Sequence, residues 1–163
     1  MKKLRNKNKA GFTLIELLVV IAIIGLLASV VLLALNGARA KSRDAKRLAD
    51  ASQMASAFEL FYNDNNSYPT VGVTAGTLAI LTNQIATNMF LVPKYIGLMP
   101  TAPTPADGSC GTGAGGGNND YNYTVPSITG NLASSYTFTF CLGSPTGGYS
   151  VAGGHTLTPA GIQ

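Results

Sequence analysis

The hydrophobic pattern of the chain begins with one long apolar run at residues 12–35. Its only interruptions are Thr13, Glu16, Gly25 and Ser29. An α-helix rises about 1.5 Å per residue, so the run extends over roughly 36 Å and is long enough to cross a hydrocarbon core of about 30 Å. The pattern therefore predicts a membrane-spanning helix over residues 12–35.

A narrower apolar stripe follows within residues 36–62. Its members are Leu48, Ala51, Ala55, Phe58 and Tyr62, with Met54 and Phe61 beside them. Spacings of three and four residues place these side chains on one face of a helix, and such a face covers a core. Because Asn, Asp, Ser and Pro at residues 63–69 end the helix, we expect one helix from residue 12 to residue 62.

Residues 63–163 are expected to form a small head. Strands are predicted at 121–125, 135–142, 149–152 and, more weakly, 156–158, after a short helix at 77–89. The alternation of Tyr136, Phe138 and Phe140 with smaller or polar residues predicts a sheet with one face against the helical stripe. The predicted fold class is α+β, with a long N-terminal helix packed on a small C-terminal antiparallel sheet.

Basic residues are concentrated at two places. Of the 11 Lys and Arg in the 163 residues, five precede Gly11 and five lie at 39–47. The positive-inside tendency places residues 1–11 in the cytoplasm and sends the rest outward, as in a single-pass protein of the cytoplasmic membrane. From Phe12 onward six Lys and Arg stand against seven Asp and Glu, so the head offers no cationic patch for nucleic acid.

Residues 39–50 carry charges of both signs at helical spacing. The expected ion pairs are Lys41/Asp44, Asp44/Arg47, Lys46/Asp50 and Arg47/Asp50. The main interpretation is a solvated helix face just outside the membrane. In the alternative interpretation, the cations meet acidic lipid headgroups or a neighbouring subunit.

Glu16 is an ionisable residue inside the apolar run. Near the bilayer centre such a group costs about 2.5–3.5 kcal/mol, so it needs a cationic partner unless it reaches the cytoplasmic interface. A removable secretory signal has an apolar core of only about 7–15 residues. The longer run seen here predicts a helix that is retained.

The segment Lys-Ala-Gly-Phe-Thr-Leu-Ile-Glu-Leu-Leu-Val-Val at residues 9–20 closely resembles the prepilin processing signal of type IV pilins and type II secretion pseudopilins. The resemblance implies cleavage between Gly11 and Phe12 by prepilin peptidase and N-methylation of Phe12. It also implies that Glu16 pairs with the terminal amine of a neighbouring subunit in a filament core. The resulting parts are a cytoplasmic leader (1–11), a transmembrane and assembly helix (12–35), its amphipathic continuation (36–62) and the head (63–163).

Two further positions bear on this resemblance. The segment Asn-Asn-Ser-Tyr-Pro-Thr at residues 65–70 is similar to the point at which pilins and pseudopilins leave the long helix. Leu33 stands where many family members have a proline that is linked to local unwinding of the helix. Gly25 and Gly37 are then the weaker candidates for a helix break.

Cys110 and Cys141 are the only cysteines, and both lie in the part placed outside the cytoplasm. A disulfide between them would close a loop of about 32 residues and stabilise the head by roughly 3–4 kcal/mol. Two reduced, buried thiols are the alternative.

Side chains suited to catalysis are scarce. The one histidine, His155, follows two glycines and is expected in a turn, and no Cys-x-x-Cys is present. We therefore expect no catalytic triad, metal cluster or cofactor. Asp107 and Asp120 flank a Gly-rich stretch at 111–120 that is expected to be a mobile turn, and their oxygens suit Ca²⁺, which the C-terminal loop of many major pseudopilins binds.

These observations predict a structural subunit of a type IV pilus-like filament that extends beyond the cytoplasmic membrane, and not an enzyme. The expected partners are prepilin peptidase, other pilin subunits, an inner-membrane assembly platform and membrane lipid. A pseudopilin of a type II secretion system is one alternative. A membrane-anchored minor pilin that acts as a binding module is the other.

Overall fold

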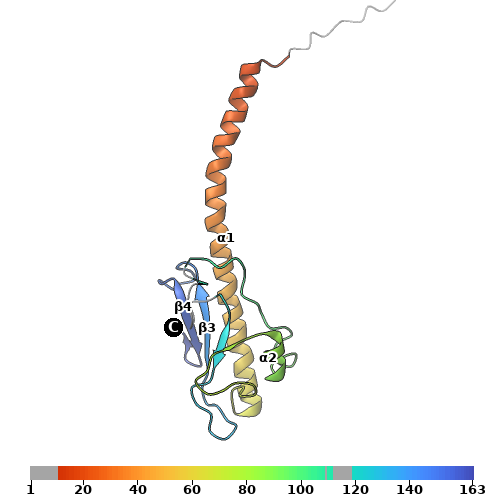
Figure 1. Ribbon diagram of the computed structural model, residues 1–163, viewed down its shortest axis with the longest axis vertical. Coiled ribbons are helices and arrows are strands. Elements are labelled where there is room, and N and C mark those ends of the chain that lie inside the picture. Colours follow the sequence, from red (N-terminus) through yellow and green to blue (C-terminus); the bar gives the residue numbers. More distant parts are fainter. Residues whose placement is uncertain (1–10, 109, 112–118) are drawn as a thin grey trace, which may run out of the picture. The chain divides into compact units, whose positions relative to one another are not determined.

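The computed structural model describes residues 11–108, 110–111 and 119–163 (Figure 1). Its elements are α1 (Leu14–Asn65), β1 (Ala79–Ile80), α2 (Asn83–Asn88), β2 (Asn122–Thr124), β3 (Thr137–Leu142), β4 (Gly153–Thr158) and β5 (Gly161–Ile162). This layout confirms the predicted α+β class. The chain divides after Ala38 into two compact units, which are described separately.

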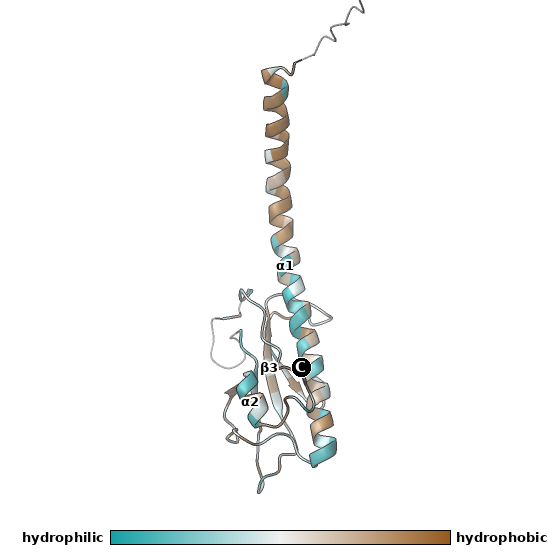
Figure 2. Cartoon of the chain, turned by 90° about the vertical axis from the view of Figure 1, so that its right-hand side faces the viewer, coloured by the Kyte–Doolittle hydropathy of each residue, from teal (hydrophilic) through white to brown (hydrophobic). Residues whose placement is uncertain are grey.

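The first unit holds the apolar part of α1, which is drawn in brown in Figure 2. Within the described residues, α1 is the one helix that is long and apolar enough to cross a membrane. Its side chains from Leu14 to Leu35 are exposed, because an isolated helix has no partner against which to bury them. The helix passes through Gly25 and Gly37 without a break, and the Ser29 hydroxyl donates to the Gly25 carbonyl at 2.9 Å.

The second unit, Arg39–Gln163, combines the rest of α1 with a five-stranded sheet of order β1-β2-β3-β4-β5. Every neighbouring pair of strands is antiparallel. In the central pair, Phe138 lies opposite Leu157 and Phe140 lies opposite His155. These four side chains are buried, so this face of the sheet forms the core.

The core lies where the predicted stripe of α1 meets that face. The Phe58 ring centroid is 4.6 Å from that of Tyr136 and 5.0 Å from that of Tyr123. The buried members of the stripe are Ala51, Met54, Phe58 and Phe61, while Leu48, Ala55 and Tyr62 are partly buried. The expectation that the helix stripe packs on the aromatic face of the sheet is confirmed.

The strand prediction at 149–152 is wrong. Residues 149–152 belong to the loop before β4, which begins at Gly153. The expectation of a turn at His155 is also wrong, because His155 is buried within β4 and its ring stacks on Phe140 with centroids 5.8 Å apart. A strand tolerates the two preceding glycines here because they pair with Leu142 and Cys141 of β3.

The predicted helix at 77–89 is wrong in its first half. Ala79 and Ile80 pair with β2 as an edge strand, and α2 covers only Asn83–Asn88. Thr82 stops the helix from extending backward, because its extended backbone and its side-chain oxygen, which accepts from the Ile85 N–H at 3.3 Å, make it an N-cap.

Candidate processing and assembly site

The start of α1 is closed by a reciprocal pair of hydrogen bonds between Thr13 and Glu16. The Thr13 hydroxyl oxygen accepts from the Glu16 N–H at 3.3 Å. Glu16 Oε2 in turn accepts from the Thr13 N–H at 2.8 Å and from the Thr13 hydroxyl at 2.7 Å. This capping box satisfies two backbone donors that a helix N-terminus otherwise leaves without partners.

The capping role of Glu16 is not among the sequence-based predictions, which consider only a cationic partner or the cytoplasmic interface for its carboxylate. The Thr-x-x-Glu spacing at residues 13–16 is the signal that would have found it. Within the described residues, Glu16 Oε1 accepts no hydrogen bond. The cap therefore leaves one carboxylate oxygen free for an external donor.

The predicted cleavage position lies immediately before this cap. Gly11 and Phe12 precede the helix, both are exposed, and Phe12 retains 90% of its accessible surface. Among the described residues other than its chain neighbours, no heavy atom lies within 4 Å of the position that a Cβ would take at Gly11. The peptide bond between the two residues is thus open to approach, while residues 1–10 of the predicted leader lie outside the described residues.

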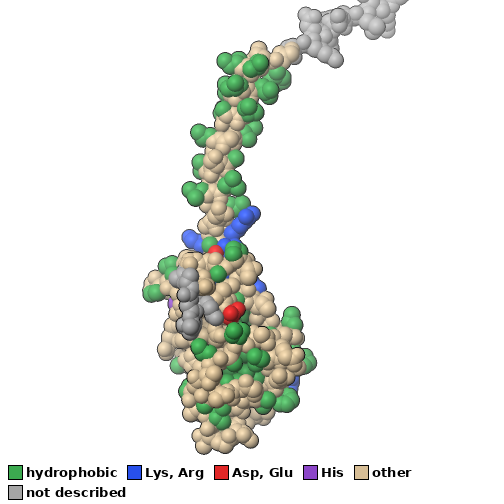
Figure 3. Space-filling model, viewed as in Figure 1, with side chains coloured by type: hydrophobic (Ala, Val, Ile, Leu, Met, Phe, Trp, Pro, Cys, Tyr) green, Lys and Arg blue, Asp and Glu red, His purple; other side chains and the backbone are tan. Residues whose placement is uncertain are grey.

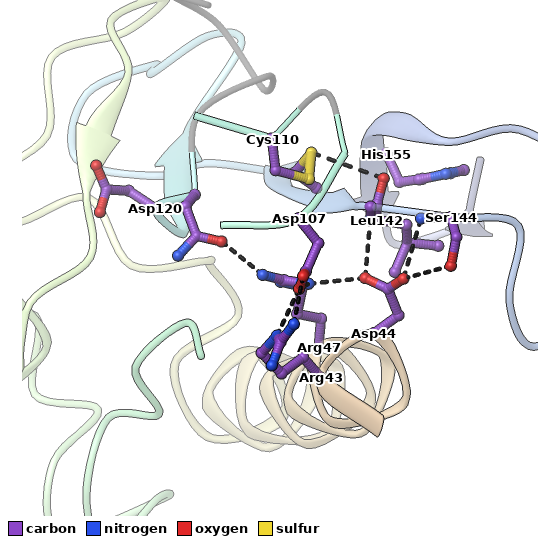
Figure 4. The surroundings of a disulfide bond; sticks show 12 residues. Arg43, Asp44, Arg47, Asp107, Cys110, Asp120, Leu142, Ser144 and His155 are labelled. Carbon is purple, nitrogen blue, oxygen red and sulfur yellow. Dashed lines mark hydrogen bonds and ion pairs between the residues drawn. A yellow bond between two sulfur atoms is a disulfide. The ribbon is translucent and has the colours of Figure 1, made fainter. Parts of the chain in front are cut away.

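A second set of polar contacts centres on Arg47, which is only 1% exposed (Figure 4). Its Nη1 donates to Asp44 Oδ1 at 2.7 Å and to Asp107 Oδ2 at 3.3 Å. Its Nη2 donates to Asn119 Oδ1 at 2.7 Å and to the Pro103 carbonyl at 3.2 Å. One guanidinium thereby joins α1 to three separate positions of the head.

Asp44 extends these contacts to the turn that follows β3. Its Oδ1 accepts from the Gly143 N–H at 2.8 Å. Its Oδ2 accepts from the Ser144 N–H at 3.0 Å and from the Ser144 hydroxyl at 2.9 Å. Since Asp44 is fully buried, these donors and Arg47 replace the water that its charge would otherwise need.

Asp107 is held by two arginines. Arg43 Nε donates to Asp107 Oδ2 at 2.7 Å, and Arg43 Nη2 pairs with Asp107 Oδ1. The hydrogen bonds from Arg43, aided by Arg47, hold the pKa of the Asp107 carboxyl below its usual value. Asp107 therefore stays ionised, and paired with α1, at a more acidic pH than an ordinary aspartate would.

The predicted disulfide is confirmed and lies beside these contacts. Cys110 and Cys141 are joined, with their Cα atoms 5.8 Å apart. The bond links the loop that carries Asp107 to strand β3. A Cβ at Gly143 would collide with Asp107, so the glycine permits this close approach.

The expectation of a solvated charged face on α1 is wrong for Asp44, Arg47 and Asp50, which are all buried. Two of the predicted ion pairs form, Asp44–Arg47 at 2.7 Å and Lys46–Asp50 at 4.0 Å. Among these described residues the other two predicted pairs do not form, and Asp50 accepts instead from the Tyr121 hydroxyl at 2.7 Å. Burial and this bond raise the pKa of Tyr121.

The sequence predicts no cofactor, and it offers Asp107 and Asp120 only as candidate oxygen ligands for Ca²⁺. Within the described residues no three His, Cys, Asp or Glu side chains lie close enough to hold a metal ion. Both oxygens of Asp107 already face guanidinium groups, while Asp120 is exposed. Most of the Gly-rich stretch between the two aspartates lies outside the described residues.

The chain was compared with protein families, with individual proteins and with solved structures. Residues 6–32 match the family model described as the prokaryotic N-terminal methylation motif. The chain is 30% identical over 132 residues to type II secretion system core protein G of Vibrio cholerae, an alignment that covers 81% of this chain and 80% of that protein. No solved structure matches the chain.

Other relatives match over a shorter part of the chain. Type II secretion system core protein G of Aeromonas hydrophila is 39% identical over 67 residues, 41% of this chain and 47% of that protein. The type IV wide pilus major component PilA4 of Thermus thermophilus is 45% identical over 62 residues, 38% of this chain and 47% of that protein. The chain thus spans about half the length of these two relatives, and none of the three names describes an enzyme.

The long match to the Vibrio protein agrees with the methylation motif, the apolar helix and the α+β head. The chain therefore belongs to the family of membrane-anchored, pilin-like subunits that includes type II secretion system core protein G and type IV pilins.

Proposed function

We propose that this chain is cut between Gly11 and Phe12 by prepilin peptidase, N-methylated on Phe12, and polymerised through α1 into an extracytoplasmic filament. The observation that carries the proposal is the exposed Gly11–Phe12 bond placed directly before the Thr13–Glu16 cap. A peptidase requires an accessible, non-helical bond. The cap supplies a fixed point at which the helix begins, whatever the length of the leader.

Cleavage creates the cation that the apolar run lacks. The new ammonium group on Phe12 lies in the same layer as Glu16, and Glu16 Oε1 accepts no bond in the described part of the chain. Pairing that oxygen with the ammonium of a neighbouring copy offsets the cost of holding a carboxylate among apolar side chains. Glu16 would then select the position of the incoming subunit, while apolar helix packing would hold it.

The orientation and the remaining partners follow from the same features. The basic residues before Gly11 favour a cytoplasmic N-terminus. Before assembly, membrane lipid would surround the exposed apolar side chains of α1. Extraction from that lipid into a filament would require an inner-membrane assembly platform.

The contacts of Arg47 bear on whether the head needs a bound metal ion. Four oxygens from Asp44, Pro103, Asp107 and Asn119 surround this guanidinium. We propose that the head uses Arg47 as its structural cation and requires neither Ca²⁺ nor another cofactor. Thermal unfolding that is unchanged by a calcium chelator would support this, whereas a clear loss of stability on chelation would contradict it.

The test of the main proposal is intact-mass and N-terminal peptide analysis of the protein from native membranes and from sheared surface material. We expect a chain that starts at methylated Phe12 and is present in the sheared fraction. A chain that starts at Met1, or one cut after residue 35, would overturn it.

A secretion pseudopilus is the second candidate for the filament. It is favoured by the alignment to the Vibrio secretion protein, which covers 81% of this chain against 38% for the Thermus pilus protein. Deletion of the gene would separate the two. Loss of exported enzymes from the medium indicates the secretion filament, and loss of surface fibres with normal export indicates the pilus.

A further inference from the structure

Most cations of the second unit are paired inside it. Figure 3 shows several Lys and Arg side chains gathered at one end of this unit. The internal ion pairs join Arg43 to Asp107, Arg47 to Asp44 and Asp107, Lys46 to Asp50, and Lys94 to Asp64. Arg39 and Lys41 are exposed and form no ion pair within the described part of the chain. These two cations are therefore left for an external anion.

Arg39 and Lys41 follow the apolar run closely along the chain. Leu35, the last residue of that run, precedes them by four and six positions. Because α1 continues without a break through all three residues, the two cations come roughly 6 and 9 Å after Leu35 at a rise of about 1.5 Å per residue. The headgroup layer on each side of a bilayer is about 5–7 Å thick. When the run fills the hydrocarbon core, both backbones lie at or just beyond the outer headgroups.

The direction of helical side chains brings both charges back toward the membrane. In an α-helix each Cα–Cβ bond tilts toward the helix N-terminus, so a side chain covers the turn before its own Cα. For Arg39 and Lys41 that direction is toward Leu35. Two positions correspond to about 200° around the helix axis, so the two side chains do not converge on one ligand. Lipid headgroups surround a membrane-spanning helix on every side and can meet both.

The acids nearest to these two cations along α1 are already engaged. Asp44 and Asp50 are buried, and Arg47 and the Tyr121 hydroxyl donate to their carboxylates. The next acid of the helix, Glu59, lies 18 positions beyond Lys41, roughly 27 Å further along the axis. Residues 36–50 of α1 therefore present exposed positive charge and no exposed acid.

We propose that Arg39 and Lys41 bind the phosphate groups of anionic phospholipids in the outer leaflet of the cytoplasmic membrane, and this rests on the proposed orientation with a cytoplasmic N-terminus. A guanidinium binds a phosphate through two parallel hydrogen bonds, and a lysine ammonium binds it as a point charge. These contacts hold the start of the second unit at the membrane before assembly. They break when the subunit leaves the bilayer for a filament.

The test is cross-linking to lipids that carry a photoreactive headgroup. The full-length chain is placed in phosphatidylcholine vesicles with a trace of either photoreactive phosphatidylglycerol, which is anionic, or photoreactive phosphatidylcholine, which is not. The measured quantity is the ratio of the two cross-link yields on residues 36–48. A cation at an anionic membrane surface enriches anionic lipid about fivefold, so the ratio should be about five for the wild type. It should fall to near one for Arg39→Gln/Lys41→Gln.

Three comparisons isolate the two cations. Arg39→Lys/Lys41→Arg keeps both charges and should keep the wild-type ratio. Lys94→Gln removes an exposed cation that is paired with Asp64 and should leave the ratio unchanged. The basic residues before Gly11 lie on a different peptide and are the same in every variant, so their own cross-links provide an internal reference for the yield.

A wild-type ratio near one, or a ratio that Arg39→Gln/Lys41→Gln leaves unchanged, overturns the proposal. If that double variant keeps the wild-type ratio but is lost from sheared filaments, the two cations contact a neighbouring copy, and lipid binding is again the wrong assignment.

A separate measurement tests the orientation on which the proposal rests. Both native cysteines are joined in the disulfide, so Ser42→Cys provides a single exposed thiol beside Lys41. A membrane-impermeant thiol reagent should label it in intact spheroplasts. Labelling only after the spheroplasts are opened would overturn the orientation and the outer leaflet, whereas the vesicle ratio measures lipid binding in either orientation.

Discussion

Asp44 and Arg47, one turn apart on α1, form a 2.7 Å ion pair whose side chains are 0% and 1% exposed. Removal of two charges from water is costly, and their mutual attraction offsets this only when further hydrogen bonds satisfy both groups. Here Gly143 and Ser144 donate to the acid, and Asn119 and the Pro103 carbonyl accept from Nη2 of the base, whose buried Nε has no hydrogen-bond partner among the described residues. The pair therefore fixes how the loops of the head lie on the helix.

Arg47→Leu should destabilise the second unit by about 3–5 kcal/mol, because it leaves Asp44 buried without its cation and removes one of the two partners of Asp107. The chain has no Trp, so urea unfolding of the full-length protein in detergent is followed by tyrosine fluorescence. Arg39→Leu, at an exposed position without an ion pair, is the control and should shift stability by less than about 0.5 kcal/mol. Equal effects of the two variants would contradict the role given to Arg47.

The stability of the head should fall in acid partly through Asp107. Its folded pKa lies below its unfolded value of about 3.9 because Arg43 stabilises the charged form. The stabilising contribution is thus present in full above the unfolded pKa and is lost as the pH falls through the folded pKa. Asp107→Asn should flatten the dependence of unfolding free energy on pH below about pH 4.

Asp64→Asn provides the comparison for this acid effect. Lys94 likewise lowers the pKa of Asp64, but that pair is largely exposed, with side-chain exposures of 64% and 45%. Solvent screens such a pair, so the pH profile of Asp64→Asn should stay close to that of the wild type. A profile of Asp107→Asn that runs parallel to the wild type would count against the Asp107 ion pairs.

Loss of the disulfide should cost roughly 3–4 kcal/mol on the chain-entropy model for a sequence separation of 31. The same segments are also held by Asp44, which binds the turn just after Cys141, and by Arg47, which binds Asp107 just before Cys110. We therefore expect Cys110→Ala/Cys141→Ala and Arg47→Leu to be non-additive in a double-mutant cycle of unfolding free energies. Additivity within about 0.5 kcal/mol would show that the two restraints act independently.

The sequence correctly predicts those features of the fold that depend on the local pattern of apolar and polar residues. The apolar run at 12–35 lies in α1 and the stripe around Phe58 lies in the core. The strand predicted at 135–142 is present as β3, which begins two residues later at Thr137. The hydrophobic pattern did not predict the burial of Asp44 and Arg47, because charged residues on a helix are normally expected to face solvent. Yet positions 44, 47, 51, 54 and 58 continue one helical spacing, so the stripe, extended upstream, reaches both residues.

Two predictions of secondary structure are wrong because pairing with a distant strand overrides the preference of the local sequence. Residues 79–80 have helical character, but they complete the sheet as the edge strand beside β2. His155 follows two glycines that suggest a turn, but it lies in β4 opposite Phe140. Neither pairing is encoded in the neighbouring residues, so a single sequence cannot reveal it.

Glu16→Gln separates the two roles of this residue. Gln at the third helical position also completes a capping box, so the amide oxygen can still accept from the Thr13 N–H that now binds Glu16 Oε2 at 2.8 Å. The start of the helix and cleavage after Gly11 should therefore be unchanged, whereas the charge that attracts the ammonium of a neighbouring Phe12 is gone. We expect processed, membrane-retained subunits and a loss of most sheared filaments, measured by N-terminal peptide analysis of both fractions.

Thr13→Ser and Glu16→Ala complete the design of that experiment. Thr13→Ser preserves the hydroxyl that bonds the Glu16 N–H and should assemble normally. Glu16→Ala removes both the cap and the charge, so any defect it shows beyond that of Glu16→Gln measures the cap. If Glu16→Gln forms abundant normal filaments while Glu16→Ala does not, Glu16 acts in assembly through the capping box rather than through its charge, and the pairing with the ammonium of Phe12 is wrong.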